Sequence, residues 1–559
     1  MTSRTAAAPA AFDAIAARVA RARDLLLSVR TAYVLGALVL AQWVALLVFA
    51  LTVRHNGWLY YAGGDQLWHY SGAYLLAHGD LPPTFVGYGW SILMLPFAAV
   101  AGPNIVSALP AIVLLNTLVL GPVALVCVYG IASRIAGRLF GYWAALLWIA
   151  LPYLGVLFVQ EGYHQKYTEL TLPQLLGLSS VPDYPSIVAL LVAAYFCLRA
   201  LDSETWYPAA AAGLATGYSL AIKPSNSIFL LAPALLLLVC RWRAVLPFAL
   251  ALAPPLLTLA LWKYRGLGQL AAAPAEPVPL AGGVGSLGRR IYNPDLNSWD
   301  HLHQVLLALR EHFWAPRVME WLPLAGIVAL LLRSRRGFLL LAPWFVAYLL
   351  LKGTYEPASV DDASFWRIMM PAYPAFLLLA ASVVLLVPGV SARPAPIGFR
   401  LHGRRLLAAA GVTAFVFAAL PIGVIAAVPP LHDVGRQALT YGAGLIPVSA
   451  ELSPRAVVGE SGVTVTWKGQ PSDSAAVFYH VLRTNLPGGT SMCAGRLNNA
   501  ADDCRFYGDS IGVTKGQSFV DRPGPGTWTY RIGVAANWLD DQSLGDVTVI
   551  STPVSVTVR

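Results

Sequence analysis

Two aspartates lie beside apolar segments, where a carboxylate can accept a proton at a membrane surface. Asp65 follows two glycines and precedes a helical pattern that places His69 one turn along on the same face. Asp183 stands between Pro182 and Pro185, which predict a rigid, non-helical turn before the next apolar run. Each carboxylate is a candidate general base, and each is also a candidate cap for the helix that follows it.

Two basic residues stand where lipid-facing segments begin or end. Lys223 lies between two closely spaced apolar runs, and Arg367 lies at the edge of a later one. Ionisable groups at membrane depth are functional candidates, and an ammonium or guanidinium group suits a lipid-linked phosphate. The alternative for both is snorkelling, or a salt bridge to Glu356, Asp361 or Asp362.

A further polar segment precedes Asp183 and contains Glu161, His164 and Lys166. These side chains are candidates for binding a substrate, as is His69. Metal-ligand spacings such as CxxC or HExxH do not occur in the sequence. We therefore predict no metal site.

The composition is that of a membrane protein. Hydrophobic residues make up 57% of the 559 residues, charged residues make up 12%, and the mean hydropathy is +0.61. One soluble core could not bury that much apolar surface, so lipid must solvate most of the chain. The net charge of +10 comes from short basic clusters between apolar runs, a pattern that indicates helix ends near anionic lipid and no nucleic-acid partner.

The apolar runs predict about eleven membrane-spanning helices. They cover 31–53, 106–131, 139–160, 185–201, 206–222, 225–240, 243–263, 319–333, 337–352, 368–388 and 405–428. Basic clusters lie before the first run or after even-numbered runs, so the positive-inside rule predicts a cytoplasmic N-terminus and an extracytoplasmic C-terminus in the cell membrane. The loops 54–105, 161–184, 264–318 and 353–367 then lie outside, and their length and charge indicate that the working face is extracytoplasmic.

The last part of the chain has a different pattern. Short alternating segments near 463–467, 476–481, 527–534 and 547–558 predict strands of one β-sandwich. Cys493 and Cys504 are close in this polar tail, and a disulfide between them is expected in an oxidising compartment. We expect a cytoplasmic segment (1–30), a transmembrane domain (31–430) and an extracytoplasmic β-sandwich (445–559), whose Trp467, Phe478-Tyr479 and Trp528 to Arg531 segments resemble a fibronectin type III module.

The ordered motifs of residues 30–430 resemble integral-membrane glycosyltransferases of the GT-C type. They are an aspartate after the first span, Asp183-Tyr184-Pro185-Ser186 after the third, Lys223-Pro224-Ser225 between spans, and Arg367 followed by Met370-Pro371-Ala372-Tyr373-Pro374. The relatives implied are bacterial transferases akin to aminoarabinose and protein mannosyl transferases. The resemblance implies a GT-C-like fold and an inverting transfer of sugar from a polyprenyl-phosphate donor to a glycan, lipid or protein acceptor.

The same resemblance implies roles for individual residues. Asp65 would deprotonate the acceptor hydroxyl, Lys223 and Arg367 would neutralise the leaving phosphate, and Asp183 would orient the acceptor or the cations. Lys166 and His164 are alternatives for the phosphate. Many relatives have an acidic pair at the first-loop position, whereas Gln66 follows Asp65 here. We therefore expect no cofactor, with a divalent metal as the alternative.

Three other functions are compatible with the class of protein. A transporter or flippase of a lipid-linked precursor would carry ionisable residues at mid-membrane, whereas the polar residues here concentrate in outside loops. A non-catalytic scaffold would explain the β-rich tail and leave the long loops unexplained. An inactive relative of the transferases would have nearly the same sequence.

Overall fold

The computed structural model describes most of the helical region and most of the β-rich tail. The described residues are 18, 21, 23–52, 65–77, 79, 81–82, 86–101, 105–158, 173–267, 291–312, 316–361, 364–388, 390, 392–395, 403–429, 441–442, 448–469, 478–485, 491–492, 505–514, 516–535 and 547–559. Most of the expected cytoplasmic segment 1–30 lies outside them.

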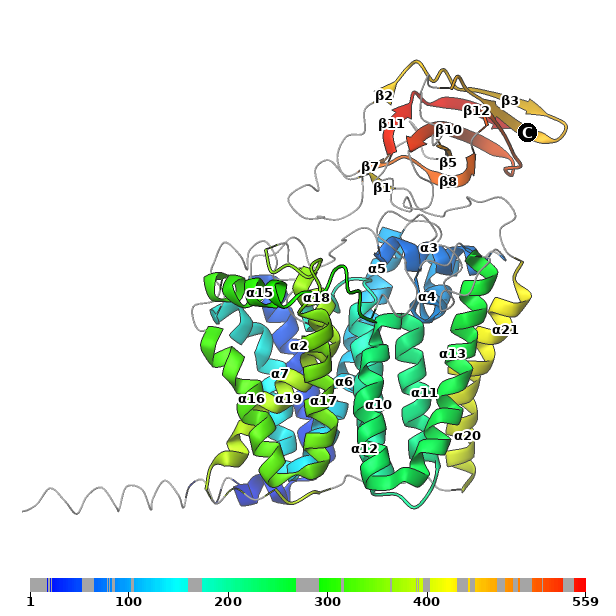
Figure 1. The fold of residues 1–559 in the computed structure, drawn as a ribbon. Helices are drawn as coiled ribbons and strands as arrows, with labels where there is room; N and C mark the ends of the chain where they lie inside the picture. The colour runs from blue at the N-terminus through cyan, green and yellow to red at the C-terminus, as the bar shows by residue number, and fades with distance from the viewer. Residues whose placement is uncertain are drawn as a thin grey trace, which may run out of the picture.

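Apolar helices form a bundle in which the long members run side by side (Figure 1). Their bounds are α2 Thr31–Thr52, α5 Ile105–Leu114, η1 Leu115–Leu120, α6 Gly121–Ala136, α7 Arg138–Phe158, α10 Asp183–Leu201, α11 Tyr207–Ile222, η2 Pro224–Leu230, α12 Leu231–Arg241, η3 Trp242–Ala244, α13 Val245–Leu267, α16 Pro316–Arg333, α17 Arg335–Lys352, α18 Ser364–Met369, η4 Met370–Ala372, α19 Tyr373–Ser382, η5 Val383–Leu386, α20 Gly403–Ala414, η6 Phe415–Ala419 and α21 Leu420–Ala427. Each of the apolar runs in the sequence coincides with one helix or an unbroken helical series.

Six segments among the described residues are long and apolar enough to cross a membrane. They are Thr31–Thr52, Ala108–Ala136, Asp183–Leu201, Pro224–Arg265, Ser364–Leu386 and Gly403–Ala427. The chain is thus a multi-pass helical membrane protein. The count of about eleven spans stays a prediction, because several helices of the bundle are shorter than a span requires.

Small residues let neighbouring helices approach closely. On α11, Gly213 and Gly217 stand one turn apart and face α13, where a Cβ on Gly213 would lie 2.0 Å from the Phe248 carbonyl oxygen. On α16, a Cβ on Gly326 would lie 2.0 Å from the Leu379 carbonyl oxygen of α19. Association of helices in lipid depends on such backbone contact, because lipid tails are as apolar as the side chains.

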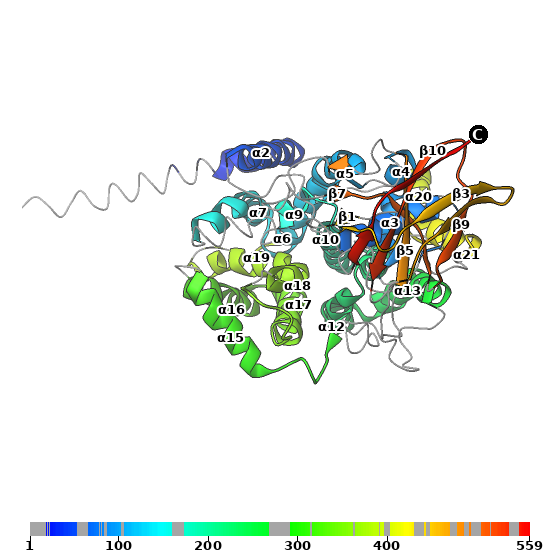
Figure 2. The same ribbon diagram turned by 90° about the horizontal axis from the view of Figure 1, so that it is seen from above.

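The first long loop of the sequence contains two helices, α3 (Asp65–Ala77) and α4 (Tyr88–Ala101). The interpretation of 54–105 as loop alone was incomplete, because α4 is an apolar helix with Trp90 and Met94 fully buried. Its 14 residues are too few to cross about 30 Å of hydrocarbon. The loop 264–318 likewise contains α15 (Trp299–His312). The helices α3 and α15 lie at the same end of the bundle (Figure 1) and well apart from each other in the view from above (Figure 2).

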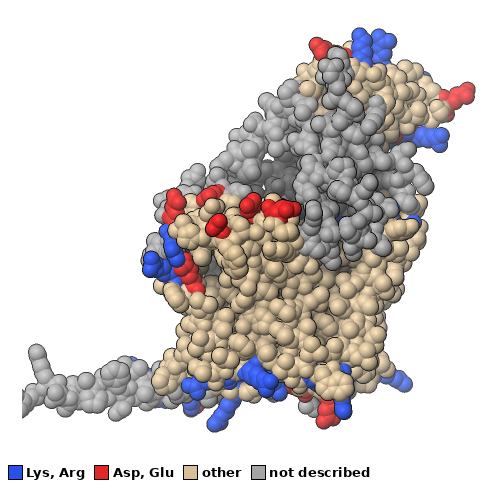
Figure 3. Space-filling view, in the orientation of Figure 1, with Lys and Arg blue, Asp and Glu red and all other residues tan. Residues whose placement is uncertain are grey.

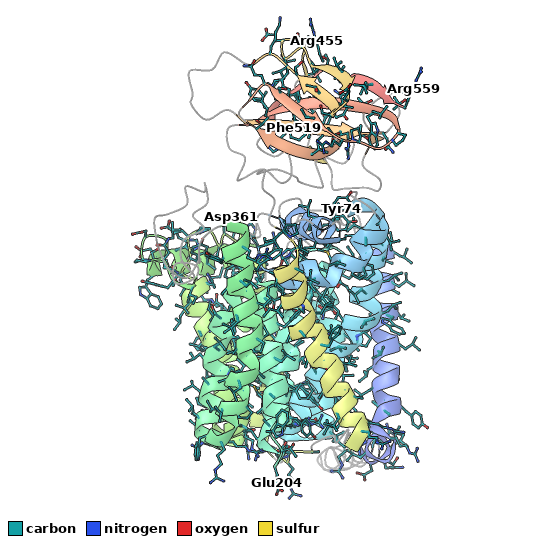
Figure 4. All side chains as sticks on the ribbon, turned by 90° about the vertical axis from the view of Figure 1, so that its right-hand side faces the viewer. Tyr74, Glu204, Asp361, Arg455, Phe519 and Arg559 are labelled. Carbon is teal, nitrogen blue, oxygen red and sulfur yellow. The ribbon has the colours of Figure 1, made fainter. Side chains whose placement is uncertain are left out.

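Charged side chains gather at the two ends of the helical region. Lys and Arg predominate at the end opposite α3, whereas Asp and Glu gather on the other rim at the side of α15, next to a smaller group of Lys and Arg (Figure 3). Glu204 marks the first end, and Tyr74 and Asp361 mark the second (Figure 4). This is the asymmetry on which the predicted orientation rests, and the orientation itself stays a prediction.

The tail forms a β region beyond the end that carries α3 (Figure 1). Its strands are β1 Tyr441–Gly442, β2 Val448–Ser449, β3 Arg455–Gly459, β4 Gly462–Thr466, β5 Phe478–Thr484, β6 Ser491–Met492, β7 Arg505–Phe506, β8 Asp509–Thr514, β9 Ser518–Asp521, β10 Gly526–Ala535, β11 Val547–Ser551 and β12 Val554–Val558. One sheet has the order β2-β11-β10-β5-β8, with β12 also on β10; a second has the order β3-β4-β9, and β1-β7-β6 form a third. The strands expected from the sequence are confirmed, including the break at Pro553.

Residues from both larger sheets form the core of the β region. Trp467, which follows β4, packs against Tyr479 on β5 with ring centroids 5.6 Å apart. The hydroxyl of Tyr530 donates to Asp521 Oδ2 at 2.8 Å, and Arg483 pairs with the same carboxylate at 2.8 Å. Cys493 and Cys504 lie outside the described residues, so their disulfide stays a prediction.

Candidate functional site

The site begins at the first turn of α10. Pro182 stands at the N-cap position and Asp183 is the first helical residue, with the Ser186 N–H bonded to the Pro182 carbonyl at 3.1 Å. The expectation of a non-helical turn at Asp183 was therefore wrong. Proline lacks an N–H and has a fixed φ, so Pro182 and Pro185 fit a helix start, where N–H groups have no helical partner. The position also places a carboxylate at the positive end of the helix dipole.

The Asp183 carboxylate lies between two cations from distant parts of the chain. Lys223 Nζ is 2.5 Å from Oδ1, and an Arg367 terminal nitrogen is 3.2 Å from Oδ2. The side chain of Asp183 is 0% exposed, whereas those of Lys223 and Arg367 are 23% and 26% exposed. A carboxylate at that depth is stable only when opposite charges and hydrogen bonds replace its water.

Lys223 reaches this position because α11 ends beside α4. The residue before a proline is driven to an extended backbone, and Lys223 has φ −135° and ψ 99° ahead of Pro224. A Cβ on Gly89 would lie 2.8 Å from the Ile222 nitrogen, so only glycine allows α4 to begin this close to α11. The hydroxyl of Tyr218 donates to the Gly89 carbonyl at 2.8 Å and holds the two helices together.

Arg367 is carried by α18, which leads into the span that ends at Leu386. Its backbone carbonyl also faces the site, 3.5 Å from Lys223 Nζ. The indole N–H of Trp344 on α17 donates to the Pro371 carbonyl at 2.9 Å and fixes the turn after α18. The alternative partner Asp361 is exposed and lies 3.1 Å from His312 Nε2. Glu356 has no contact with Arg367 among the described interactions, and Asp362 lies outside the described residues.

Asn226 connects the helices that carry Asp183 and Lys223. Its amide nitrogen donates to Ser186 Oγ at 2.6 Å on α10 and to the Ser219 carbonyl at 3.1 Å on α11. Its amide oxygen accepts from the Tyr348 hydroxyl of α17 at 3.2 Å. All four residues are buried. Asn226 was not among the residues predicted from the sequence, although a polar residue three positions after Lys223 at the start of an apolar run was the available signal.

A second set of polar contacts surrounds the turn before Asp183. Gln66 Oε1 accepts from the Ser180 N–H at 3.0 Å and from Ser180 Oγ at 2.7 Å. The Trp90 indole of α4 donates to the Ser180 carbonyl at 2.7 Å, and Asn116 of η1 donates to the Ser179 carbonyl at 3.0 Å. Three helical elements therefore hold this turn, and Gln66 and Asn116 are 0% exposed.

The remaining candidates are placed less fully. Asp65 is the first residue of α3, but its side chain lies outside the described residues. His69 is on the same helix and is buried, with 2% exposed. Glu161, His164 and Lys166 lie outside the described residues. Among the residues that the structure describes, no group of three His, Cys, Asp or Glu side chains could hold a metal ion.

The cluster of Asp183, Lys223 and Arg367 has the composition of an anion site. Two cations and one carboxylate leave a formal charge of +1, since +2 − 1 = +1. An ammonium has three N–H donors and a guanidinium has five, more than their bonds to Asp183 use. Both side chains are partly exposed. A phosphate oxygen is a suitable acceptor for both.

Comparison with known proteins finds similarity in fold alone. No family model matches the chain, and no curated protein matches it. ArnT from Cupriavidus metallidurans, bound to undecaprenyl phosphate, is 15% identical with a TM-score of 0.40, over 68% of this chain and 64% of that one. The apo oligosaccharyltransferase of Archaeoglobus fulgidus is 15% identical with a TM-score of 0.39, over 72% and 57%.

A third structure, Archaeoglobus fulgidus AglB with an inhibitory peptide and a dolichol-phosphate, is 13% identical with a TM-score of 0.34, over 71% and 56%. This chain thus spans less than two thirds of the length of each of these proteins. The neighbours are GT-C glycosyltransferases, the family that the sequence resembles. Similarity at this level leaves the activity to be argued from the residues of this chain.

Proposed function

We propose that this chain is an inverting glycosyltransferase that moves a sugar from a polyprenyl-phosphate donor to a glycan, lipid or protein acceptor outside the cytoplasm. The observation that carries the proposal is the buried Asp183 carboxylate held between Lys223 and Arg367 at one end of an apolar bundle. A centre of net positive charge at that depth suits a phosphate whose lipid tail lies in the bilayer.

In this reaction the acceptor hydroxyl oxygen forms a bond to the anomeric carbon while the bond from that carbon to the phosphate oxygen breaks. Asp65 accepts the hydroxyl proton, and Lys223 and Arg367 stabilise the negative charge that grows on the departing phosphate. The leaving group is already an anion, so no general acid is required. Asp183 does not contact the sugar in this scheme and holds the two cations in place.

The proposal places the end with α3 and α15 on the extracytoplasmic side. The basic residues at the opposite end support this orientation (Figure 3). The carboxylate at the start of α3 and the two cations then share one face of the membrane, where a lipid-linked sugar and a water-soluble acceptor can meet.

Chemistry at the membrane surface fits the described charges better than transport. In the six candidate spans, the charged residues stand near helix ends or at the turn Trp242–Ala244. A transporter of a charged lipid precursor requires polar groups along its path through the bilayer. The distribution therefore favours a transferase over a flippase.

The β region is proposed to be a fibronectin type III-like module, with the disulfide Cys493–Cys504 in one of its loops. The order β3-β4-β9 in one sheet and β11-β10-β5-β8 in the other supports this, because both sheets share one core. Trp467 is used in that core, so it is not offered as a sugar-stacking residue.

The proposal is tested with the full chain in nanodiscs and a panel of polyprenyl-phosphate sugars. We expect wild type to bind at least one donor and to transfer or slowly hydrolyse its sugar. Lys223→Met should weaken binding of polyprenyl phosphate itself by about tenfold or more, since a charge-assisted hydrogen bond contributes about 1.5–3 kcal/mol. Arg310→Met is the matched control, because Arg310 is a cation on α15 that pairs with Glu320, away from Asp183. Equal loss in both variants, or no binding by wild type, would contradict the proposal.

A further inference from the structure

The first helical turn of α3 is connected to the turn that precedes α10 by one side chain. Gln66 directly follows Asp65, and Ser180 is three residues before Asp183. Gln66 Oε1 accepts both the Ser180 N–H and the Ser180 hydroxyl, at 3.0 and 2.7 Å. The distance between Asp65 and the cation site is therefore set partly at this contact.

The other described contacts of the turn lead to different helices. Trp90 connects Ser180 to α4, and Asn116 connects Ser179 to η1. The helix α3 also packs on α4, where a Cβ on Gly72 would be 3.0 Å from Ser91 Oγ. Gln66 thus fastens the end of α3 where Asp65 stands to the turn at Ser180.

The burial of the contact makes it strong and directional. Gln66 and Ser180 are both 0% exposed. At this burial, an amide oxygen with two donors is costly to lose, because the Ser180 N–H then loses its hydrogen-bond partner. The Gln66 side chain therefore resists displacement of the α3 end relative to the Asp183 turn.

We propose that Gln66 is a positioning residue, which holds Asp65 at the correct distance from the phosphate site of Asp183, Lys223 and Arg367 through its double hydrogen bond to Ser180. This inference rests on the proposed transferase function. Gln66 does not contact the substrate in it, so its loss affects the rate of transfer rather than the binding of the lipid phosphate. A displacement of about 1 Å between reacting groups can lower a rate by about a hundredfold.

The test compares variants at position 66 that keep or remove the oxygen that accepts hydrogen bonds from Ser180. Gln66→Leu has similar size and no such oxygen, whereas Gln66→Glu keeps both the length of the side chain and an oxygen that can accept hydrogen bonds. We expect Gln66→Leu to lower kcat by about 10- to 100-fold with less than a threefold change in the Kd for polyprenyl phosphate. Gln66→Glu should retain more kcat than Gln66→Leu. Adding Ser180→Ala to Gln66→Leu should cause no further loss, because the contact is already gone.

A serine elsewhere provides the control. Ser382 is also 0% exposed, and its hydroxyl bonds only to the Leu378 carbonyl of its own helix among the described contacts. Ser382→Ala should leave kcat and Kd close to wild type. The positioning role is wrong if Gln66→Leu keeps the wild-type kcat, or if it lowers kcat and the affinity for the donor by the same factor. It is also wrong if the loss of kcat caused by Ser180→Ala adds fully to the loss caused by Gln66→Leu.

Hydrogen exchange separates this inference from the transferase proposal. In wild type, the Ser180 N–H is protected by Gln66, so Gln66→Leu should speed exchange by tenfold or more in peptides that contain Ser180 and the first turn of α3. The Ser382→Ala variant should not. If no donor supports transfer by wild type, the proposed function fails, while exchange still decides whether Gln66 connects the two elements. Unchanged exchange in Gln66→Leu would overturn the inference in either case.

Discussion

Removal of Lys223 should destabilise the protein because it leaves the buried Asp183 with one partner. At 2.5 Å and an effective dielectric constant of about 20, the attraction between the two charges is about 7 kcal/mol. The value for Arg367 at 3.2 Å is about 5 kcal/mol. Desolvation offsets much of each, so we expect Lys223→Met to cost about 3–5 kcal/mol, the usual result of breaking a buried pair.

The double variant distinguishes this mechanism from a general packing defect. Asp183→Asn removes the buried charge that Lys223→Met leaves with Arg367 as its remaining cationic partner. The two changes together should therefore cost at least about 2 kcal/mol less than the sum of the single changes.

Thermal unfolding of the purified protein in detergent measures the effect. For a helical region of this size, Lys223→Met should lower Tm by on the order of 5 °C, and the double variant should recover part of that loss. Arg310→Met should change Tm little, because its pair with Glu320 is at the surface. If Lys223→Met unfolds at the wild-type temperature, or if the two changes are additive, Asp183 does not depend on Lys223 and the account of the ion cluster is refuted.

Three further predictions concern other residues. Arg367→Lys keeps the charge but loses the planar fork, so the Kd for polyprenyl phosphate should rise by about tenfold; unchanged binding would show that only charge matters. Asn226→Leu breaks three buried hydrogen bonds and should cost about 3 kcal/mol in thermal unfolding, whereas Tyr348→Phe breaks one and should cost about 1 kcal/mol; equal losses would contradict the network. Burial lowers the pKa of His480 from 6.5 to about 4, so the folded β region disfavours the protonated form. The free energy of unfolding of the β region, monitored by tryptophan fluorescence, should fall by about 3 kcal/mol as pH drops from about 6.5 to about 4. His480→Phe should remove that part of the pH dependence; a variant with the same pH dependence as wild type would contradict the shift.

The helices and several strands could be predicted because their signals are local. A run of apolar residues long enough for a helix in lipid, or a short alternation of apolar and polar residues, needs no knowledge of the rest of the chain. The end of α11 before Lys223 could also be predicted from the local sequence, since Pro224 forces the preceding residue out of the helix. The helix α4 was missed because 14 apolar residues are too few to indicate a span.

The family resemblance implied that Asp183 could orient the cations, but the contacts themselves could not be predicted from the residues, because the partners are far apart in the chain. Asp183 is 40 residues from Lys223 and 184 residues from Arg367. The sequence offered Asp361 as a nearer partner for Arg367, but that carboxylate is exposed and pairs with His312 instead. Only the packing of α10, α11 and α18 brings the three charged groups together. Gln66 was noticed as a departure from a family pattern, and its contact with Ser180 required the fold.

The most direct test of the central claim is sugar transfer by wild type and Asp65→Asn in nanodiscs, with binding of the same polyprenyl-phosphate sugar measured in parallel. Asp361→Asn is the matched control, since it removes an exposed carboxylate at the same end of the bundle. We expect wild type and the control to transfer the sugar with inversion, whereas Asp65→Asn should bind the donor and not transfer it. Turnover by Asp65→Asn at the wild-type rate would contradict the assignment of Asp65 as the base, and binding of no donor by wild type would contradict the transferase itself.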